Sequence, residues 1–318
     1  MALPNHQLQN QLPNLYLGLC CINTHLRAQK PPVFCSRSCT RKTFTLEKAK
    51  ELALQNVRDI STMIEWNERN HIHCFRLSSD MFPHFTDTET EGYTIDFAHD
   101  ELLRAGQLAQ KYNQRIVMHP GQYNQVGAKS ANVYAQTVHD LQHHADILDA
   151  MQIDPNGVLI VHGGGTYGDK SATIRRWMEQ FDDLPQAVKR RLVLENCEKG
   201  YSTQDCLFIS DETGIPVVFD FHHYHCYSLL HPDLPQDPIA DLLPEVVETW
   251  GSRQPLMHVS EQGEGRIGHH SDFIENLPQE LLDYLHVHPE VHIDLEIEAK
   301  MKEQAIFKLY NKYRWLKN

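Results

Sequence analysis

Short runs of apolar residues, rich in Val, Ile, Leu and aromatic side chains, alternate along the chain with segments in which apolar residues recur at helical spacing. The apolar runs predict eight strands, at residues 15–23, 71–79, 115–119, 157–162, 191–197, 215–223, 255–260 and 292–298. The segments with helical spacing are residues 46–70, 97–113, 131–151, 170–181, 203–212, 239–250, 273–285 and 302–315. The pattern therefore predicts a repeated strand–helix unit.

The predicted strands are apolar on both faces, which is typical of a parallel sheet covered by helices. Eight such units close most simply into a (β/α)8 TIM barrel, because the alternative, an open doubly wound sheet, needs short polar edge strands that the sequence does not offer. We therefore expect an α/β protein with a single barrel domain over residues 15–318, preceded by an N-terminal extension at residues 1–14.

Composition places the chain among ordinary globular proteins. Of its 318 residues, 41% are hydrophobic and 22% are charged, which excludes a disordered chain or a collagen. The formal net charge of −13 excludes a basic surface over the whole molecule, so any contact with nucleic acid has to be local. No signal peptide or membrane span is evident, so we expect a protein without membrane contact or an obligate protein partner, either cytoplasmic, associated with the nucleoid in a prokaryote, or nuclear.

The eight cysteines occur without CxxC pairs, which favours reduced thiols over disulfides in a chain of this size. Cys35 and Cys39, with Cys20, Cys21 and His25, are an alternative zinc site, but their spacing is not a standard one. We therefore expect buried or loop thiols.

Histidines and carboxylates end six consecutive predicted strands, where barrels of this kind carry their active sites. They are His119, His162, Glu195, Asp220 with His223, His258, and Glu298 after Asp294 and Glu296. A single histidine at a strand end is usually structural, but so many imidazoles and carboxylates at one rim would be costly to bury unless cations lay among them. A mixed nitrogen and oxygen set suits Mn²⁺ or Zn²⁺, and with His270 included the number of ligands implies two or three ions.

Several motifs along the chain together resemble those of the UV damage endonucleases, barrel relatives of the endonuclease IV type of apurinic endonucleases. The motifs are His119-Pro120-Gly121-Gln122-Tyr123, His162-Gly163-Gly164-Gly165 with Gly168-Asp169-Lys170, Leu194-Glu195-Asn196, Asp220-Phe221-His222-His223, His270-Ser271-Asp272-Phe273-Ile274 and Glu298-Ala299-Lys300. Each motif alone is weak, but their order and spacing are specific.

The resemblance implies a manganese-dependent enzyme that cuts double-stranded DNA on the 5′ side of UV photoproducts, such as pyrimidine dimers and 6-4 photoproducts. The hydroxide that attacks the phosphate would be activated by the metal ions, with Glu195, Asp220, His258 and Glu298 as catalytic residues. Glu195 would bridge two ions. The implied metal ligands are His119, His162, Glu195, Asp220, His223, His258, His270 and Glu298.

Gln122 and Tyr123 match the pair of residues with which the family probes the duplex at the lesion. An amide and a planar ring can fill the gap left by unstacked bases, which agrees with this role. Asn23, Lys170 and Arg175 are further candidate DNA contacts, although a single surface cation is as often merely solvated.

Two positions depart from the family pattern. Leu256 stands where the family usually has a lysine, two residues before the strand-seven histidine, and Leu19 stands where its first strand commonly has a tyrosine. Leu256 therefore changes the charge expected near the metal ions, and Leu19 changes a contact expected with the lesion.

Three alternatives remain open at the level of sequence, because one fold serves many functions. The first is a general apurinic/apyrimidinic endonuclease, the second a metal-dependent sugar isomerase with the same fold, and the third a non-catalytic DNA-binding barrel.

Other histidines are expected outside the metal site. His222 flanks His223 on the predicted strand, where alternation turns neighbouring side chains to opposite faces. His139, His143 and His144 fall on a predicted helix and are expected to face water.

Overall fold

The computed structural model describes residues 14–317, in which eight strands form the sheet. The strands are β1 (Leu15–Cys20), β2 (Cys74–Leu77), β3 (Arg115–Met118), β4 (Leu159–His162), β5 (Leu192–Glu195), β6 (Val217–Asp220), β7 (Leu256–Val259) and β8 (Ile293–Ile297). They neighbour one another in chain order in a closed barrel, so the chain has the predicted (β/α)8 TIM-barrel fold. The expected N-terminal extension lies outside the described residues except for Asn14 and stays a prediction.

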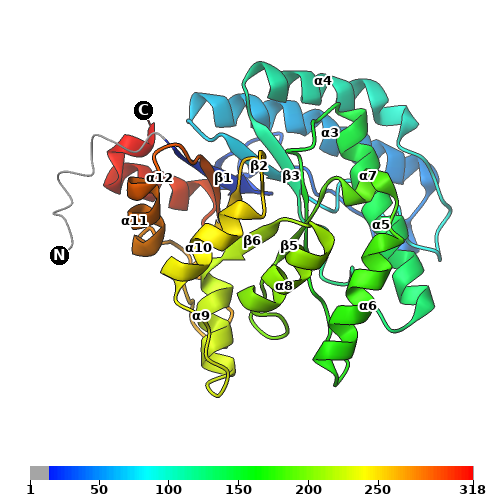
Figure 1. Cartoon of the computed structure of the whole chain (residues 1–318). Helices are drawn as coiled ribbons and strands as arrows, with labels where there is room; N and C mark the ends of the chain where they lie inside the picture. Colours follow the sequence, from blue (N-terminus) through cyan, green and yellow to red (C-terminus); the bar gives the residue numbers. More distant parts are fainter. Residues whose placement is uncertain (1–13, 318) are drawn as a thin grey trace. The chain divides into compact units, whose positions relative to one another are not determined.

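Helices follow the strands in the expected alternation (Figure 1). They are α2 (Thr24–Arg27), α3 (Leu46–Arg69), α4 (His99–Lys111), α5 (Ala131–Ala150), α6 (Lys170–Asp182), α7 (Gln186–Lys189), α8 (Thr203–Thr213), α9 (Phe221–Leu230), α10 (Ile239–Glu248), α11 (Gln279–Val287) and α12 (Glu303–Lys312), with 3₁₀ turns η1 (Arg41–Thr43), η2 (Asp96–Ala98) and η3 (Arg314–Lys317). Side-chain caps explain several starts: Asp169 accepts from the Ala172 N–H at the head of α6, and Ser202 with Asp205 forms a capping box at α8.

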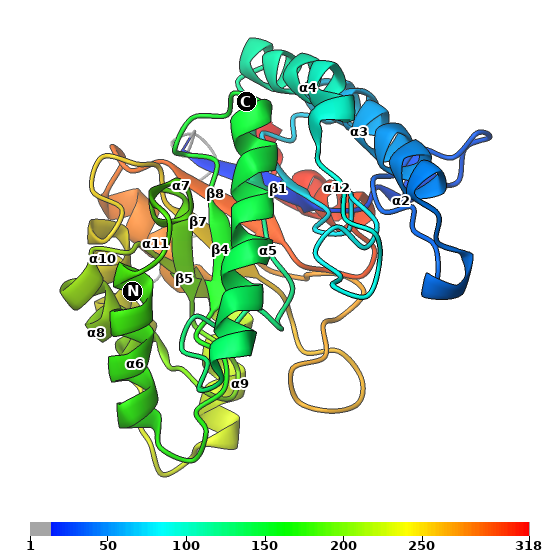
Figure 2. The same ribbon diagram turned by 90° about the vertical axis from the view of Figure 1, so that its right-hand side faces the viewer.

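The chain divides into two compact units, each described here by itself. The first, the N-terminal unit, is Cys20–Leu192. In it β2 runs parallel to β3, from Cys74 opposite Arg115 to Leu77 opposite Met118, and β3 pairs with β4. Helix α3 packs against α4, and α5 packs beside β4, as Figure 2 shows.

The second, the C-terminal unit, comprises residues 14–19 and 193–317 of the described chain. Here β5, β6, β7, β8 and β1 pair in parallel, each with the next. The register sets Asp220 beside His258 and His258 beside Glu296. Polar residues of three neighbouring strands are thereby brought to one level of the sheet.

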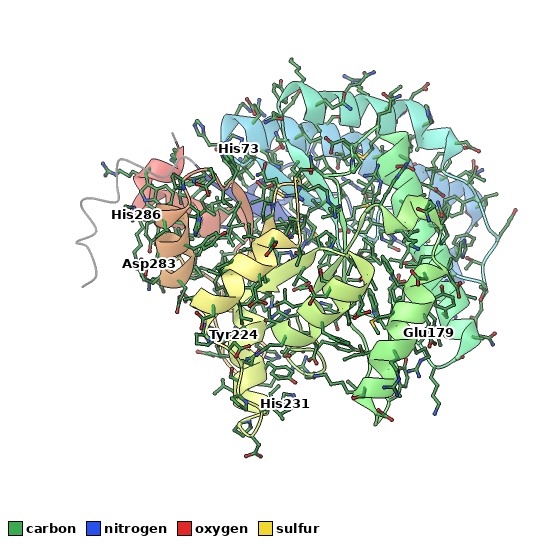
Figure 3. All side chains as sticks on the ribbon, in the orientation of Figure 1. His73, Glu179, Tyr224, His231, Asp283 and His286 are labelled. Carbon is green, nitrogen blue, oxygen red and sulfur yellow. The ribbon has the colours of Figure 1, made fainter. Side chains whose placement is uncertain are left out.

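The predicted sixth strand was expected to continue to residue 223, but helix α9 begins at Phe221. The strand ends at Asp220, whose side chain accepts the backbone N–H of His223 at 2.7 Å and so caps the new helix. Further contacts hold α9 in place: the Tyr224 hydroxyl donates to Asp237 O at 2.9 Å, and His231 Nε2 lies 2.8 Å from Lys199 O. Figure 3 labels Tyr224 on this helix and His231 directly after it. The alternation argument for His222 and His223 was therefore wrong, because both lie on a helix.

The helix predicted at residues 273–285 begins only at Gln279. Pro278 precedes its first residue, and a proline disfavours helical conformation in the residue before it, so the helix starts after Leu277. None of the helices in the described residues is long and apolar enough to cross a membrane.

Candidate functional site

Four strand ends of the C-terminal unit carry a cluster of buried carboxylates and imidazoles. Glu195 ends β5, Asp220 ends β6, His258 lies in β7 and Glu298 follows β8 directly. His223 joins them from the first turn of α9. All five side chains are buried. We call these five residues the acid–histidine cluster.

The carboxylate and imidazole atoms of the cluster lie close to one another. Glu195 Oε1 lies 3.1 Å from His258 Nδ1 and 3.2 Å from His223 Nδ1. His258 Nδ1 also lies 3.7 Å from Glu298 Oε1. Ligand atoms of Glu195, Asp220 and His223 all lie within 4.8 Å of one another, and so do those of Asp220, His258 and Glu298. The two groups share Asp220, so the cluster offers two overlapping sets of three ligand atoms.

Negative charge dominates the electrostatics of this cluster. Burial, reinforced by neighbouring carboxylates, raises the pKa of Asp220 to about 6 although His223 opposes the rise. Burial by itself lowers the pKa of His258, but the carboxylates around it, Glu195 first among them, hold that pKa well above its usual value. The pKa of His223 is raised in the same way, against burial, first of all by Asp220. The cluster therefore attracts positive charge, either as protons on its imidazoles or as a metal ion.

The residues present fit a divalent metal ion. Asp220 Oδ2 is buried and accepts no hydrogen bond from any residue between 14 and 317, so an acceptor is left for a cation. The donors of the cluster are carboxylate oxygens and imidazole nitrogens, which suit Mn²⁺ or Zn²⁺.

Glu296 is a component that the sequence reasoning did not assign. Its Oε2 lies 2.9 Å from His258 Nε2, on the side of the ring opposite the cluster, and both side chains are fully buried. A carboxylate behind a metal-binding histidine fixes the orientation and tautomer of the ring. The signal for it was the two-residue spacing of Asp294, Glu296 and Glu298, which predicts one common face for the two residues in β8 and for Glu298 directly after it.

Asn196 was also missed, although it directly follows Glu195. Its side chain donates to Asp220 O at 3.0 Å and accepts from the Asp220 N–H at 2.8 Å. Its own carbonyl oxygen lies 3.1 Å from His223 Nδ1. Asn196 thus fixes the end of β6 and the start of α9 relative to β5.

His270 lies at the edge of this cluster. Its Nε2 is 3.7 Å from Glu298 Oε2, and its ring centroid is 6.4 Å from that of His223. The neighbouring His269 is turned into its own loop, where Nδ1 contacts Glu264 O at 3.0 Å. Burial, with His270 nearby, lowers the pKa of His222 to about 4, so His222 is a neutral neighbour of the cluster.

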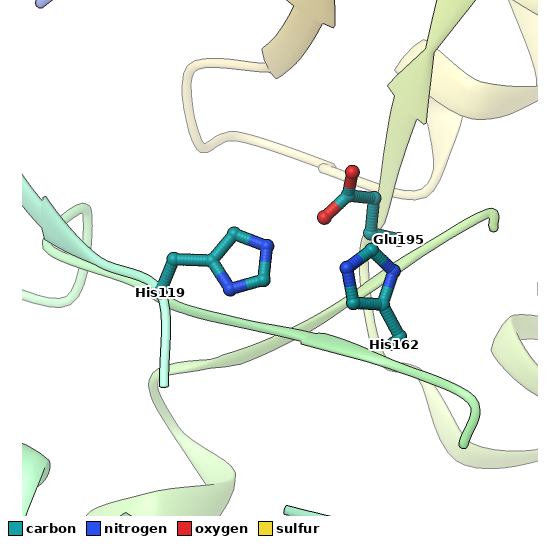
Figure 4. Close-up of side chains that lie close together, drawn as sticks. All are labelled: His119, His162 and Glu195. Atoms are coloured by element: carbon teal, nitrogen blue, oxygen red, sulfur yellow. The ribbon is translucent and has the colours of Figure 1, made fainter. Parts of the chain in front are cut away.

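In the N-terminal unit, His119 and His162 stand at the ends of β3 and β4. Their ring centroids lie 5.1 Å apart, and His119 Nδ1 is 3.2 Å from Pro120 O. Figure 4 draws the two imidazoles, together with the Glu195 side chain. The structure thus brings these two predicted ligands side by side.

Gln122 and Tyr123 are exposed in the loop that follows β3, with 59% of Tyr123 accessible. The tyrosine ring lies over Gly121, where a Cβ would stand 2.4 Å from Tyr123 Cε1. Its hydroxyl donates to Oδ1 of the buried Asp140 at 3.2 Å. Asp140 also accepts from Thr86 and Asn124. The Tyr123 ring is therefore exposed to solvent, while Asp140 holds its hydroxyl group in place.

A cavity of about 430 Å³ borders this tyrosine. Phe82, Phe85 and His143 supply aromatic walls, and Asp140 supplies polar lining. The cavity lies wholly within the N-terminal unit, between the loop after β2 and helix α5.

The expectation that His143 and His144 face water was wrong, whereas His139 is exposed. His143 stacks on Phe85, with ring centroids 3.5 Å apart. His144 Nδ1 donates to Asp140 O at 2.7 Å. Both lie on the face of α5 that packs into the protein, which helical spacing alone could not reveal for polar residues.

The remaining candidate DNA contacts occupy different surroundings. Asn23 is buried and its side-chain oxygen caps α2 through the Leu26 N–H at 2.8 Å, while its Nδ2 makes no hydrogen bond to a residue in the described range. Lys170 is the first residue of α6, and Arg175 is exposed on that helix. Leu19 and Leu256, the two departures from the family pattern, are fully buried.

The eight cysteines are free thiols. Within residues 14–317, no group able to hold a metal includes Cys35 or Cys39. Cys35 instead packs its sulfur 3.4 Å from Met63 Sδ, in agreement with the expectation of a buried thiol.

Comparison with solved structures shows the same fold at two levels of similarity. The crystal structure of SacUVDE matches with a TM-score of 0.80 and 28% identity, covering 95% of this chain and 100% of that one. Endonuclease IV from Thermus thermophilus matches with a TM-score of 0.57 and 13% identity, covering 96% of this chain and 99% of that one, which shows the fold alone.

Comparison with curated sequences gives the family. The UV-damage endonuclease of Schizosaccharomyces pombe is 38% identical over 93% of this chain and 50% of its own length. The chain likewise spans 51% of the UV-damage endonuclease of Neurospora crassa, at 34% identity over 94% of this chain, so it covers about half of either fungal relative. The UV DNA damage endonuclease of Bacillus mycoides is 30% identical over 88% of this chain and 87% of its own length. The profile of the UV-endonuclease UvdE family matches residues 15–318, and the chain belongs to that family.

Proposed function

We propose that this protein is a metal-dependent DNA repair endonuclease that cuts the phosphodiester bond on the 5′ side of UV photoproducts. The observation that carries the proposal is the acid–histidine cluster, in which carboxylates and imidazoles from four strand ends are buried together. Membership of the UvdE family supports the same activity. The proposed substrate is damaged double-stranded DNA, in the nucleoid of a prokaryotic cell or in the nucleus of a eukaryotic cell.

We propose Mn²⁺ as the metal, as two or three ions, with Zn²⁺ as the alternative. The ligands would be the five residues of the acid–histidine cluster, with Glu195 as the bridge, together with His119, His162 and His270. The carboxyl ends of all strands of a barrel face the same rim, which supports adding the two histidines of β3 and β4. When bound, such ions stabilise the charge on phosphate oxygens and make water acidic enough to act as a nucleophile near neutral pH.

The residues of the chain would hold the parts of this site in position. Glu296 orients the His258 ring through its Nε2, and Asn196 holds the Asp220 backbone. Because bound ions would neutralise the carboxylates, these side chains would need no unusual pKa to act as ligands. Glu195 is the proposed bridge between two ions. Loss of its charge would remove both a metal ligand and this bridge.

Contact with DNA would come from exposed residues around the rim. Gln122 and Tyr123 would fill the space left when damaged bases turn out of the stack. Lys170 and Arg175 would pair with phosphates, which compensates locally for the net charge of −13. Asn23 is buried rather than exposed, so its proposed contact through Nδ2 would require the loop after β1 to rearrange when DNA binds. Leu19 and Leu256, which stand where the family pattern has two polar residues, are both fully buried.

The test is to map the cut on a duplex that carries one defined pyrimidine dimer, with added Mn²⁺ and after chelation. We expect one incision on the 5′ side of the dimer that requires the metal. Glu195→Gln should abolish it, whereas Glu212→Gln, the same change on the exposed face of α8, should leave it intact. Incision that persists at the wild-type rate after chelation, or in Glu195→Gln, would refute the proposal.

Two further substrates separate the alternatives in the same assay. A duplex with an abasic site that is cut faster than the dimer would favour a general apurinic endonuclease. Turnover of an aldose by the purified protein, without incision of DNA, would favour the isomerase.

A further inference from the structure

An exposed tyrosine in the loop after β4 is held in an unfavourable backbone conformation. Tyr167 has a φ angle of 51°, in the left-handed region that a bulky side chain rarely adopts. Its side chain is nevertheless 46% accessible rather than buried in the core. Strained residues of this kind persist where the surroundings hold them, and they concentrate at functional sites.

Two contacts hold the Tyr167 ring, and each partner is itself held by a further hydrogen bond. Its hydroxyl donates to Gln125 Oε1, which also accepts the Gly165 N–H at 3.3 Å. The guanidinium of Arg176 lies over the ring, with Cζ 5.4 Å from the centroid. Arg176 is itself fixed, because its Nε donates to Gly127 O at 3.0 Å. The ring is thus a rigid plane with a cation beside it.

Gln125 connects this ring to the loop that carries Tyr123. It lies two residues after Tyr123, and its backbone N–H donates to Thr137 Oγ1 on α5 at 3.0 Å. Tyr123 and Tyr167 are the two tyrosines among the exposed large hydrophobic residues of the described chain. Both belong to the N-terminal unit, on loops that follow neighbouring strands. The two loops therefore present two held aromatic rings from the same end of the sheet.

We propose that Tyr167 is a second aromatic contact for DNA, on which a nucleobase or deoxyribose of the bound strand stacks. An aromatic ring accepts any base on its face, and stacking of this kind contributes substantially to binding of unpaired nucleotides. A ring that is already fixed loses little conformational freedom on binding. Arg176 adds positive charge beside the ring for a neighbouring phosphate. The inference rests on the proposed function, because it takes DNA as the ligand.

The experiment measures binding of the full chain, with Mn²⁺ present, to a dimer-containing duplex whose target phosphodiester is replaced by an uncleavable linkage. Fluorescence anisotropy gives the Kd for wild type, Tyr167→Ala, Tyr167→Phe and Phe208→Ala. The last is a matched control, because Phe208 is 51% exposed but lies within α8 rather than on a loop at a strand end. Thermal unfolding of each variant establishes that it is folded.

We expect Tyr167→Ala to raise the Kd about tenfold, which corresponds to the loss of one base–aromatic stack. Tyr167→Phe should retain most of the affinity because the ring remains, and Phe208→Ala should bind as wild type does. A folded Tyr167→Ala variant that binds as tightly as wild type, or a Phe208→Ala variant that loses as much affinity, overturns the inference while the endonuclease proposal stands. Wild-type protein that neither binds this duplex nor cuts its cleavable counterpart overturns both.

Discussion

Replacing Asp140 by asparagine tests whether the buried Asp140 carboxylate holds the Tyr123 loop in place. Oδ1 of Asp140 accepts from Thr86 Oγ1 at 2.9 Å and from the Tyr123 hydroxyl at 3.2 Å. Oδ2 accepts from Asn124 Nδ2 at 2.7 Å. Only 2% of the residue is accessible, so water cannot replace a lost bond. An asparagine keeps the shape but brings an N–H group to a place where the neighbours donate.

The size of the effect follows from the charge of the acceptor. A hydrogen bond to a charged group contributes about 1.5–3 kcal/mol and a neutral one about 0.5–1.5 kcal/mol, so three bonds lose roughly 3 kcal/mol when the carboxylate becomes an amide. Burial of an amide costs less than burial of a carboxylate, which returns part of this loss. We therefore expect the free energy of unfolding to fall by about 2 kcal/mol in Asp140→Asn.

Urea unfolding followed by circular dichroism measures this difference. Asp146→Asn is the matched control, since Asp146 lies on the same helix, is exposed and accepts from Gln142 at 2.7 Å. It should change the free energy of unfolding by no more than about 0.5 kcal/mol. Hydrogen exchange should also become faster in the loop at residues 121–128. If Asp140→Asn is as stable as wild type, or Asp146→Asn loses as much, the charged acceptor does not hold this loop.

Four further outcomes are expected. Gly121→Ala should displace the Tyr123 ring, since the new Cβ would stand 2.4 Å from Cε1, and hydrogen exchange of this loop should then become faster. Burial lowers the pKa of His143 well below its usual value, so the unfolded state takes up a proton at this residue as the pH falls below about 6.5, whereas the folded state does not. The free energy of unfolding, measured with urea at pH 7, 6 and 5, should therefore fall by up to about 1.4 kcal/mol per pH unit because of this group. In His143→Leu this part of the pH dependence should be absent. Mn²⁺ at a hundredfold excess over its Kd should stabilise the protein by about 2.7 kcal/mol in calorimetry. Glu296→Gln should weaken Mn²⁺ binding by about 10–100-fold in titration calorimetry, because it loosens the His258 ring.

Each of these outcomes can fail separately. Wild-type exchange rates in Gly121→Ala would mean that the ring has room to move aside. A pH slope that is unchanged in His143→Leu would mean that this histidine does not titrate on unfolding. Equal calorimetric midpoints with and without Mn²⁺ would exclude an ion bound in the folded state, and unchanged Mn²⁺ affinity in Glu296→Gln would exclude an orienting role.

The order of the elements and the fold class could be predicted from the sequence, because the periodicity of apolar residues is a local property. Strand ends could be predicted well enough to bring Glu195, Asp220, His258 and Glu298 into the candidate set, because the end of an apolar run is visible in the sequence. Short elements were harder. Residues 221–223 read as a continuation of an apolar strand, and only the cap that Asp220 makes to the His223 N–H turns them into a helix.

The sequence by itself determined the repeated strand–helix unit and the residue types gathered at the strand ends. Only the tertiary structure decided which polar residues are buried and what they hold: Glu296 behind His258, Asp140 beneath Tyr123, and His143 against Phe85. The physical reason is that burial and hydrogen-bond partners depend on residues distant in the sequence. Tyr167 is the clearest case, because its ring is held by Gln125 and Arg176, neither of which is its neighbour along the chain.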